Sequence, residues 1–310
     1  MAIPESMKNI IRLFSDNEPD ITKSYKLERF VKHNIKGHPI LTSVLKGSDT
    51  DIECDGRNVT VRVCTPVDYD SSCRTAILFF HGGGWVTENI DTYTEVCINL
   101  ANFTGCKVIA VEYGLAPEHP FPEGLEDCYS AAKAVITDPS VVGVDADEIV
   151  LAGDSAGGNL AAAVSLMARD KGEFKISRQI LIYPAVNNDY SENSKYRSVI
   201  ENGTDYILTA KRISEYVSLY AACEEDMQNP YFAPILAKDL SDQPDTMIIT
   251  AEFDPLRDEG EDYGRKLKQA GNNVKIYRMK NTLHGFISLS ANIKPVGYAY
   301  KLISDYIHKV

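Results

Sequence analysis

The sequence has little of what marks a nucleic-acid-binding or membrane-spanning protein. Basic residues number 32 against 44 acidic ones, which gives a formal net charge of −12, and no run rich in Lys or Arg occurs. Such a charge would repel a phosphate backbone. No stretch approaches the roughly 20 consecutive apolar residues that a transmembrane helix needs. We therefore expect neither a nucleic-acid partner nor a transmembrane segment.

The sequence also shows no cysteine motif, and its first residues do not have the pattern of a signal peptide. The seven cysteines are odd in number and scattered, and none stands in C-x-x-C spacing, so neither a disulfide framework nor a zinc site is indicated. The first twenty residues contain charges throughout and lack the apolar core of a signal peptide. From these absences we expect a cytoplasmic protein with reduced thiols, no metal and no cofactor.

What is present suits a globular α/β protein of one large domain or two. The chain has 310 residues, of which 44% are hydrophobic, and it shows no internal repeat or low-complexity segment. Apolar runs alternate with stretches of helical spacing, which predicts a mainly parallel sheet with helices on both faces. The predicted strands are 59–63, 75–80, 106–111, 149–152, 179–186, 247–251 and 274–279. The predicted helices are 91–103, 125–136, 159–168, 210–222, 258–270 and one from Pro295 to the end.

Two segments depart from this alternation. Residues 1–50 are polar and helical in pattern, whereas 187–225 are polar and rich in tyrosine around one predicted helix. The predicted strand 59–63 alternates like an exposed or edge strand. Within the first segment, the apolar positions spaced for one helix face are Ile10, Ile11, Phe14, Leu27, Phe30 and Val31.

Ser155 stands between the predicted strand 149–152 and the predicted helix 159–168. Gly153 and Gly157 bracket it in a G-x-S-x-G pattern, which is typical of a sharp turn that exposes a nucleophilic serine. The motif alone is equally compatible with a corner where small residues pack closely. A reactive serine would also need a histidine as base and an acid to orient that histidine.

The rest of the chain offers both partners. Of the six histidines, His284 follows a late predicted strand in a short loop, and Asp254 follows another. Asp258 and Glu259 are rival acids, although their place in the first turn of a helix already explains them by the helix dipole. The favoured order, Ser155, Asp254 and His284, is that of the α/β-hydrolase arrangement.

A glycine run after the strand 75–80 offers backbone donors for a developing oxyanion. His81 is followed by three glycines, and the N–H groups of Gly83, Gly84 and Ala156 are the candidate donors. A phosphate loop is the competing interpretation, but no Gly-Lys-Ser/Thr sequence and no dinucleotide fingerprint is present. We interpret His81, and Asp154 beside the serine, as side chains that brace these loops.

Taken together, these motifs identify a family. The chain resembles the hormone-sensitive-lipase-like carboxylesterases of the α/β-hydrolase fold, in their G-D-S-A-G branch, from residue 59 to about 310. The matching motifs are His81-Gly82-Gly83-Gly84-Trp85, Tyr113 with Leu115-Ala116-Pro117-Glu118-His119-Pro120-Phe121-Pro122, Gly153-Asp154-Ser155-Ala156-Gly157-Gly158-Asn159, Asp254-Pro255-Leu256-Arg257-Asp258-Glu259-Gly260 and His284-Gly285-Phe286. Gly114 stands where the family usually has arginine, which leaves one local contact undefined.

The resemblance implies roles and domains. Ser155 would be the nucleophile, His284 the base and then the acid, and Asp254 its partner, with Gly83, Gly84 and Ala156 forming the oxyanion hole. Residues 51–186 and 226–310 would form the catalytic domain, and residues 1–50 and 187–225 a helical cap.

We therefore predict a serine carboxylesterase that hydrolyses small, short-chain esters through an acyl-enzyme intermediate. An amide or N-acetyl deacylase with the same triad is one alternative, because the acyl-transfer chemistry is shared. A ligand-binding receptor on a hydrolase scaffold is another, although the retention of all three triad candidates argues against it. The physiological substrate and a homodimeric state are left open.

Overall fold

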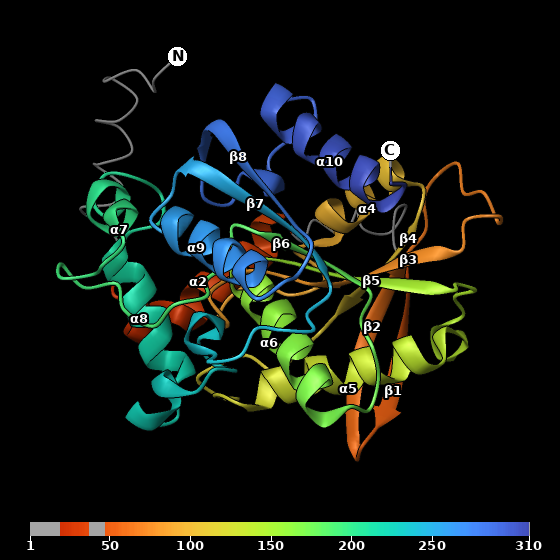
Figure 1. The fold of residues 1–310 in the computed structure, drawn as a ribbon, viewed down its shortest axis with the longest axis horizontal. Coiled ribbons are helices and arrows are strands. Elements are labelled where there is room, and N and C mark those ends of the chain that lie inside the picture. The colour runs from red at the N-terminus through yellow and green to blue at the C-terminus, as the bar shows by residue number, and fades with distance from the viewer. Residues whose placement is uncertain (1–18, 37–46, 310) are drawn as a thin grey trace.

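The computed structural model describes residues 19–36 and 47–309, which form one central sheet flanked by helices (Figure 1). The sheet has the order β1-β2-β4-β3-β5-β6-β7-β8, with β1, β2 and β4 antiparallel to one another in turn and all later pairs parallel. This confirms the predicted α/β class and the mainly parallel sheet. The strands are β1 (Ser48–Cys54), β2 (Arg57–Cys64), β3 (Thr75–Phe80), β4 (Lys107–Val111), β5 (Glu148–Asp154), β6 (Arg178–Ile182), β7 (Asp245–Phe253) and β8 (Val274–Leu283).

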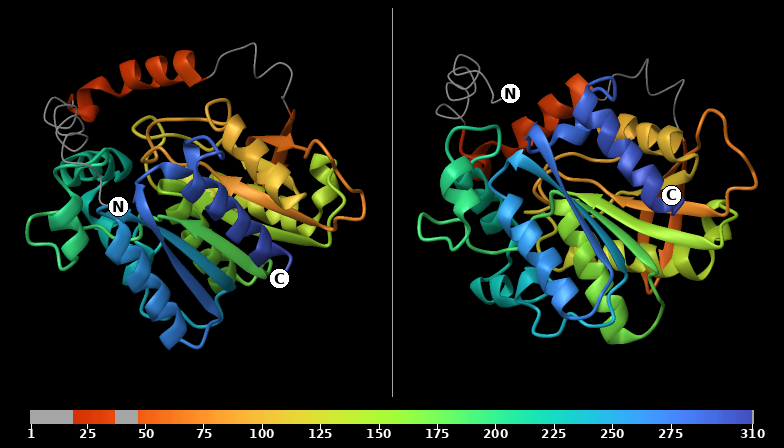
Figure 2. Two further views of the ribbon diagram at one scale, coloured as in Figure 1. Left: turned by 90° about the horizontal axis from the view of Figure 1, so that it is seen from above. Right: turned by 45° about the horizontal axis from the view of Figure 1, so that its top comes forward.

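Helices cover both faces of the sheet (Figures 1 and 2). One face packs against α4 (Thr94–Thr104) and α10 (Lys294–Ile307), and the other against α5 (Glu123–Thr137), α6 (Ala156–Lys171) and α9 (Arg257–Gln269). Within β3, Ile77 and Phe79 point into the first core and Leu78 and Phe80 into the second. Because both faces are buried, the strand is a continuous apolar run.

Three further helices, from the two segments that broke the sequence pattern, lie together beside the sheet (Figure 2). They are α2 (Ile21–Lys36), α7 (Arg197–Asn202) and α8 (Ala210–Tyr220). Helices α2 and α8 are joined where Arg212 donates to the carbonyl of Pro19 at 2.8 Å and Glu215 accepts the N–H of Ile21 at 3.2 Å. Single 3₁₀ turns complete the fold at Pro139–Val142, Glu224–Gln228, Pro234–Leu236 and Phe286–Ser288.

The start of the sheet differs from the prediction. An additional strand, β1, pairs with β2, so β2 is an interior strand and the prediction of an edge strand there was wrong. The sequence Ser48–Cys54 is mostly polar, and only Ile52 in it is buried, because β1 is the solvated edge. The domain boundary that we placed at residue 50 therefore falls inside β1.

The apolar positions that were spaced for one helix face do not form a buried face of α2. Leu27 and Phe30 of α2 are 65% and 66% exposed and Val31 is 41% exposed, whereas Ile21 is fully buried. Polar contacts rather than an apolar stripe hold most of this helix, as described below. The other predicted apolar positions of this segment, residues 10, 11 and 14, lie outside the described residues.

Two strands end four residues away from the predicted position. The strand predicted over 179–186 ends at Ile182, because Pro184 has no N–H for the ladder, and the last strand continues past Met279 to Leu283. None of the helices in the described part of the chain is long and apolar enough to cross a membrane.

Candidate active site

Ser155 occupies the turn between β5 and α6. Its backbone has φ 54° and ψ −118°, a strained conformation for a residue with a side chain. The flanking glycines make the turn possible by close backbone approach. A Cβ on Gly153 would lie 2.2 Å from the carbonyl oxygen of Gly157, and one on Gly157 would lie 2.0 Å from that of Phe80. The structure thus places Ser155 in the sharp turn that the motif predicts.

The three residues predicted to form a triad lie in one hydrogen-bonded row. Nε2 of His284 is 2.9 Å from Oγ of Ser155, and Nδ1 of His284 is 2.8 Å from Oδ2 of Asp254. Asp254 is fully buried directly after β7, and His284 directly follows β8. The neutral imidazole that suits this row donates its Nδ1 proton to Asp254 and leaves Nε2 to accept from Ser155.

The two rival acids lie elsewhere and contact other groups. Asp258 accepts hydrogen bonds from the N–H of Ser198 and from Arg257, both at 2.8 Å. Glu259 accepts from the N–H of Val186 at 2.8 Å, and burial raises its pKa to about 8. Neither carboxylate forms a hydrogen bond with His284.

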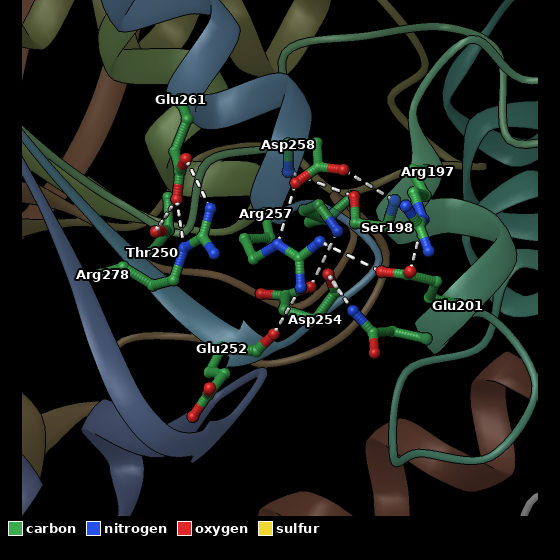
Figure 3. Close-up of polar contacts among 12 residues, drawn as sticks. Arg197, Ser198, Glu201, Thr250, Glu252, Asp254, Arg257, Asp258, Glu261 and Arg278 are labelled. Carbon is green, nitrogen blue, oxygen red and sulfur yellow. Dashed lines mark hydrogen bonds and ion pairs between the residues drawn. The ribbon is translucent and has the colours of Figure 1, made fainter.

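The turn that presents Asp254 is held by helix α7, as Figure 3 shows. Ser198 donates its hydroxyl to the carbonyl of Pro255 at 2.7 Å, and Asn202 donates to the carbonyl of Asp254 at 3.2 Å. Arg257, at the start of α9, donates to the carbonyl of Glu252 at 3.0 Å. The insertion after β6 therefore fixes the position of the acid.

The glycine loop lies across the serine turn. Gly83 and Gly84 both have positive φ, 108° and 62°. Oδ1 of Asp154 accepts the N–H of Gly82 at 2.8 Å, while Tyr93 and Tyr183 donate their hydroxyls to Oδ2 of the same carboxylate at 3.0 and 3.2 Å. Burial raises the pKa of Asp154 to about 6. Asp154 thus braces this loop against the serine turn.

His81 contributes to the same bracing. Its Nδ1 donates to the carbonyl of Gly82 at 2.7 Å, and its own carbonyl accepts the hydroxyl of Tyr113 at 2.8 Å. Burial lowers the pKa of His81 to about 4, so its ring is neutral at pH 7. The ring has no hydrogen bond to Ser155 and holds the loop in shape.

Gly114, the departure from the family pattern, packs tightly. Its N–H donates to Asp127 at 2.9 Å, and Asp127 also accepts from Arg57 at 2.8 Å. A Cβ at residue 114 would lie 2.9 Å from that of His119. The guanidinium of Arg57, in β2, therefore pairs with the carboxylate of Asp127, in α5, next to Gly114.

A cavity of about 480 Å³ surrounds the row of Ser155 and His284. The sequence motifs did not indicate its outer walls, which come from α2, α8 and the loop before α8. Apolar side chains form one part of the wall, and these are Trp85, Ile207, Leu208, Ile213, Leu256, Phe286 and Leu289. Charged side chains form another part, namely Glu28, Lys32, Glu88 and Arg212. From the sequence alone, these four residues look like ordinary solvent-exposed charges, so nothing in it predicts that they line a cavity. The ring of Tyr216 lies so close to Gly84 that a Cβ there would be 2.4 Å from it.

No group of three or more His, Cys, Asp or Glu side chains within residues 19–36 and 47–309 is arranged to hold a metal ion. The groups that the structure does bring together here are a serine hydroxyl, an imidazole and a buried carboxylate.

Comparisons with known proteins give the family of this chain. A family model described as the alpha/beta hydrolase fold matches residues 77–288. An arylesterase of Saccharolobus solfataricus is 35% identical over 242 residues, which are 77% of this chain and 76% of the relative. An ethyl acetate hydrolase of Pseudomonas putida is 32% identical over 77% of this chain and 75% of its own.

A solved structure gives the same result for the whole fold. The hyperthermophilic esterase from the archaeon Pyrobaculum calidifontis superimposes with a TM-score of 0.85 at 36% identity, covering 99% of this chain and 98% of that one. The chain therefore belongs to the α/β-hydrolase fold family, as a serine carboxylic ester hydrolase of the hormone-sensitive-lipase-like type.

Proposed function

We propose that this enzyme hydrolyses small, short-chain esters through an acyl-enzyme on Ser155. The observation that supports this most directly is the hydrogen-bonded row from Ser155 through His284 to Asp254, at 2.9 and 2.8 Å. His284 takes the hydroxyl proton as Oγ attacks the ester carbonyl, and returns it to the departing alcohol. Water, deprotonated by the same imidazole, then attacks the acyl-enzyme and releases the acid. Asp254 orients the imidazole and stabilises its charged form.

The proposed oxyanion hole consists of the backbone N–H groups of Gly83, Gly84 and Ala156. Ala156 is the first residue of α6, whose N-terminus favours negative charge. Each fixed donor contributes about 3 kcal/mol of transition-state stabilisation.

The proposed preference for short acyl chains rests on the cavity. Its volume is about 480 Å³, and its lining includes charged side chains from α2 and α8, which a long apolar chain would have to desolvate. We propose that residues 1–50, which include α2, and residues 187–225 act as the cap over a catalytic domain of residues 51–186 and 226–310.

We also propose that the enzyme works in the cytoplasm, since its odd number of scattered cysteines suits a reducing compartment. We further propose that two copies of the chain form a homodimer. Light scattering of the purified protein would then give about twice the chain mass of 34.4 kDa.

The test of the triad is turnover of p-nitrophenyl acetate and butyrate. Ser155→Ala is expected to lower kcat by about 10⁶-fold, whereas Ser72→Ala, at an exposed serine in another loop, should leave it unchanged. Full turnover by Ser155→Ala would refute the nucleophile. A p-nitrophenyl ester series of increasing acyl length tests the chain-length preference, and a matched ester and anilide pair separates the esterase from a deacylase.

A further inference from the structure

Helix α2 is fastened directly onto the loop that follows the glycine run. Arg29 donates its Nε proton to the carbonyl of Val86 at 2.6 Å and its Nη2 proton to that of Ala116 at 2.7 Å. Lys32, one turn further along, donates to Oγ1 of Thr87 at 3.1 Å. The N-terminal helix and the active-site loop are therefore one connected unit.

Lys32 stands between two carboxylates. Its Nζ is 3.1 Å from Oε1 of Glu88 and 2.9 Å from Oε1 of Glu28, and Glu28 lies 3.6 Å from Arg212. The side chain of Glu88 is only 6% exposed. Burial lowers the pKa of Lys32, but nearby Tyr216, Glu88 and Glu28 raise it by more, so it stays charged. Lys32 and Arg212 thus lie beside the carboxylates of Glu28 and Glu88 in this part of the cavity wall.

Glu88 lies against the backbone of Gly83. A Cβ on Gly83 would be 2.8 Å from Cγ of Glu88 and 2.3 Å from the carbonyl oxygen of Thr87. Glu88 itself has φ 66°, a left-handed conformation that is uncommon outside glycine. A carboxylate at this place, if uncompensated, opposes the negative charge that develops on the substrate oxygen.

We propose that Lys32 is a positioning residue of the active site, which neutralises Glu88 and holds it against Gly83 so that the glycine N–H groups face the oxyanion. The proposal rests on the proposed role of Gly83 as an oxyanion donor. It connects α2 to the catalytic site through the ion pair between Lys32 and Glu88.

The experiment compares kcat and KM for p-nitrophenyl butyrate in four variants. Lys32→Met is expected to lower kcat about tenfold, equal to roughly 1.4 kcal/mol on the barrier, with little change in KM. Lys32→Arg should retain most of kcat, because it keeps the charge. Lys23→Met, at an 84% exposed lysine of the same helix, is the matched control and should behave as wild type.

The double variant Lys32→Met/Glu88→Gln separates charge from docking. The double variant and Lys32→Met both lack the ion pair, so a decrease in kcat that comes only from weaker docking of α2 would be the same in both. If Lys32 acts by neutralising Glu88, the double variant regains kcat to within about threefold of wild type. A double variant as slow as Lys32→Met, or an unchanged kcat in Lys32→Met, would overturn the proposal.

Failure of this proposal is distinct from failure of the proposed triad. If Ser155→Ala is inactive while the Lys32 series shows no rescue, the triad stands and the role of Lys32 does not. If Ser155→Ala remains active, the proposed site is wrong, and the proposal for Lys32 falls with it.

Discussion

At the scale of single residues, burial and neighbours rather than motif position decide which acid serves the histidine. Asp154 is adjacent to Ser155 in sequence, yet its carboxylate receives Gly82 and two tyrosine hydroxyls. Asp254 is distant in sequence, yet it lies 2.8 Å from Nδ1 of His284. The role of each carboxylate follows from the donors that surround it.

Asp254→Asn is therefore expected to lower kcat by about 10⁴-fold without unfolding the protein, because an amide at this place favours the wrong imidazole tautomer. The matched control is Asp258→Asn, which removes the rival acid four residues later. It should retain far more activity than Asp254→Asn, since Asp258 contacts Ser198 and Arg257 and not His284. Steady-state kinetics with circular dichroism check both, and an Asp258→Asn variant as slow as Asp254→Asn would contradict the assignment.

Glu259 makes the stability depend on pH. Burial raises its pKa from 4.5 to about 8 in the folded protein, which favours the neutral acid. Its contribution is then fully present below the unfolded value of 4.5 and is lost as pH rises through about 8. In Glu259→Gln a neutral side chain of the same shape removes this term, so the melting temperature of the variant relative to wild type should rise between pH 5 and pH 9. A difference that stays constant with pH would show that Glu259 does not titrate in this way.

At the scale of elements, α2 is held to the rest of the protein mainly by hydrogen bonds and ion pairs rather than by a buried apolar face. Leu27 and Phe30, which are spaced for one helix face, are exposed, while Ile21 at the first turn of the helix is buried in the core. Arg29 and Lys32 reach backbone and side-chain oxygens of the loop over 86–88. A helix held in this way gives no apolar periodicity from which its orientation can be deduced.

Two substitutions in α2 test this arrangement. Ile21→Ala is expected to weaken the docking of the helix by roughly 2 kcal/mol, as for a buried large-to-small change. Leu27→Ala, at 65% exposure, should change stability by less than about 0.5 kcal/mol. Hydrogen exchange of the α2 amides measures both effects. Faster exchange in Leu27→Ala than in Ile21→Ala would show that Leu27, and not Ile21, holds the helix to the rest of the protein.

At the scale of the whole molecule, the parallel sheet brings the row of polar residues together. Ser155, Asp254 and His284 directly follow β5, β7 and β8, and the order β5-β6-β7-β8 places those strand ends along one edge. Ligand sites of open α/β sheets lie at this edge. Residues separated by 129 positions, such as Ser155 and His284, are thereby within hydrogen-bonding distance.

The sequence by itself determined the sheet class, the serine turn and the identity of the three polar residues. These depend on local signals: apolar runs, glycines that permit close backbone approach, and side chains placed just after strands. Such signals persist in the sequence because each depends on a few neighbouring residues.

Only the tertiary structure decided the pairing of β1, the orientation of α2 and the charged wall of the cavity. The polar sequence of β1 does not predict a strand. Its hydrogen bonds to β2, rather than a buried apolar face, hold it in the sheet. Lys32 and Glu88 are separated by 56 positions, and each alone has the character of an ordinary surface charge. Their meeting beside Gly83 depends on how α2 docks, which long-range contacts fix and local sequence does not.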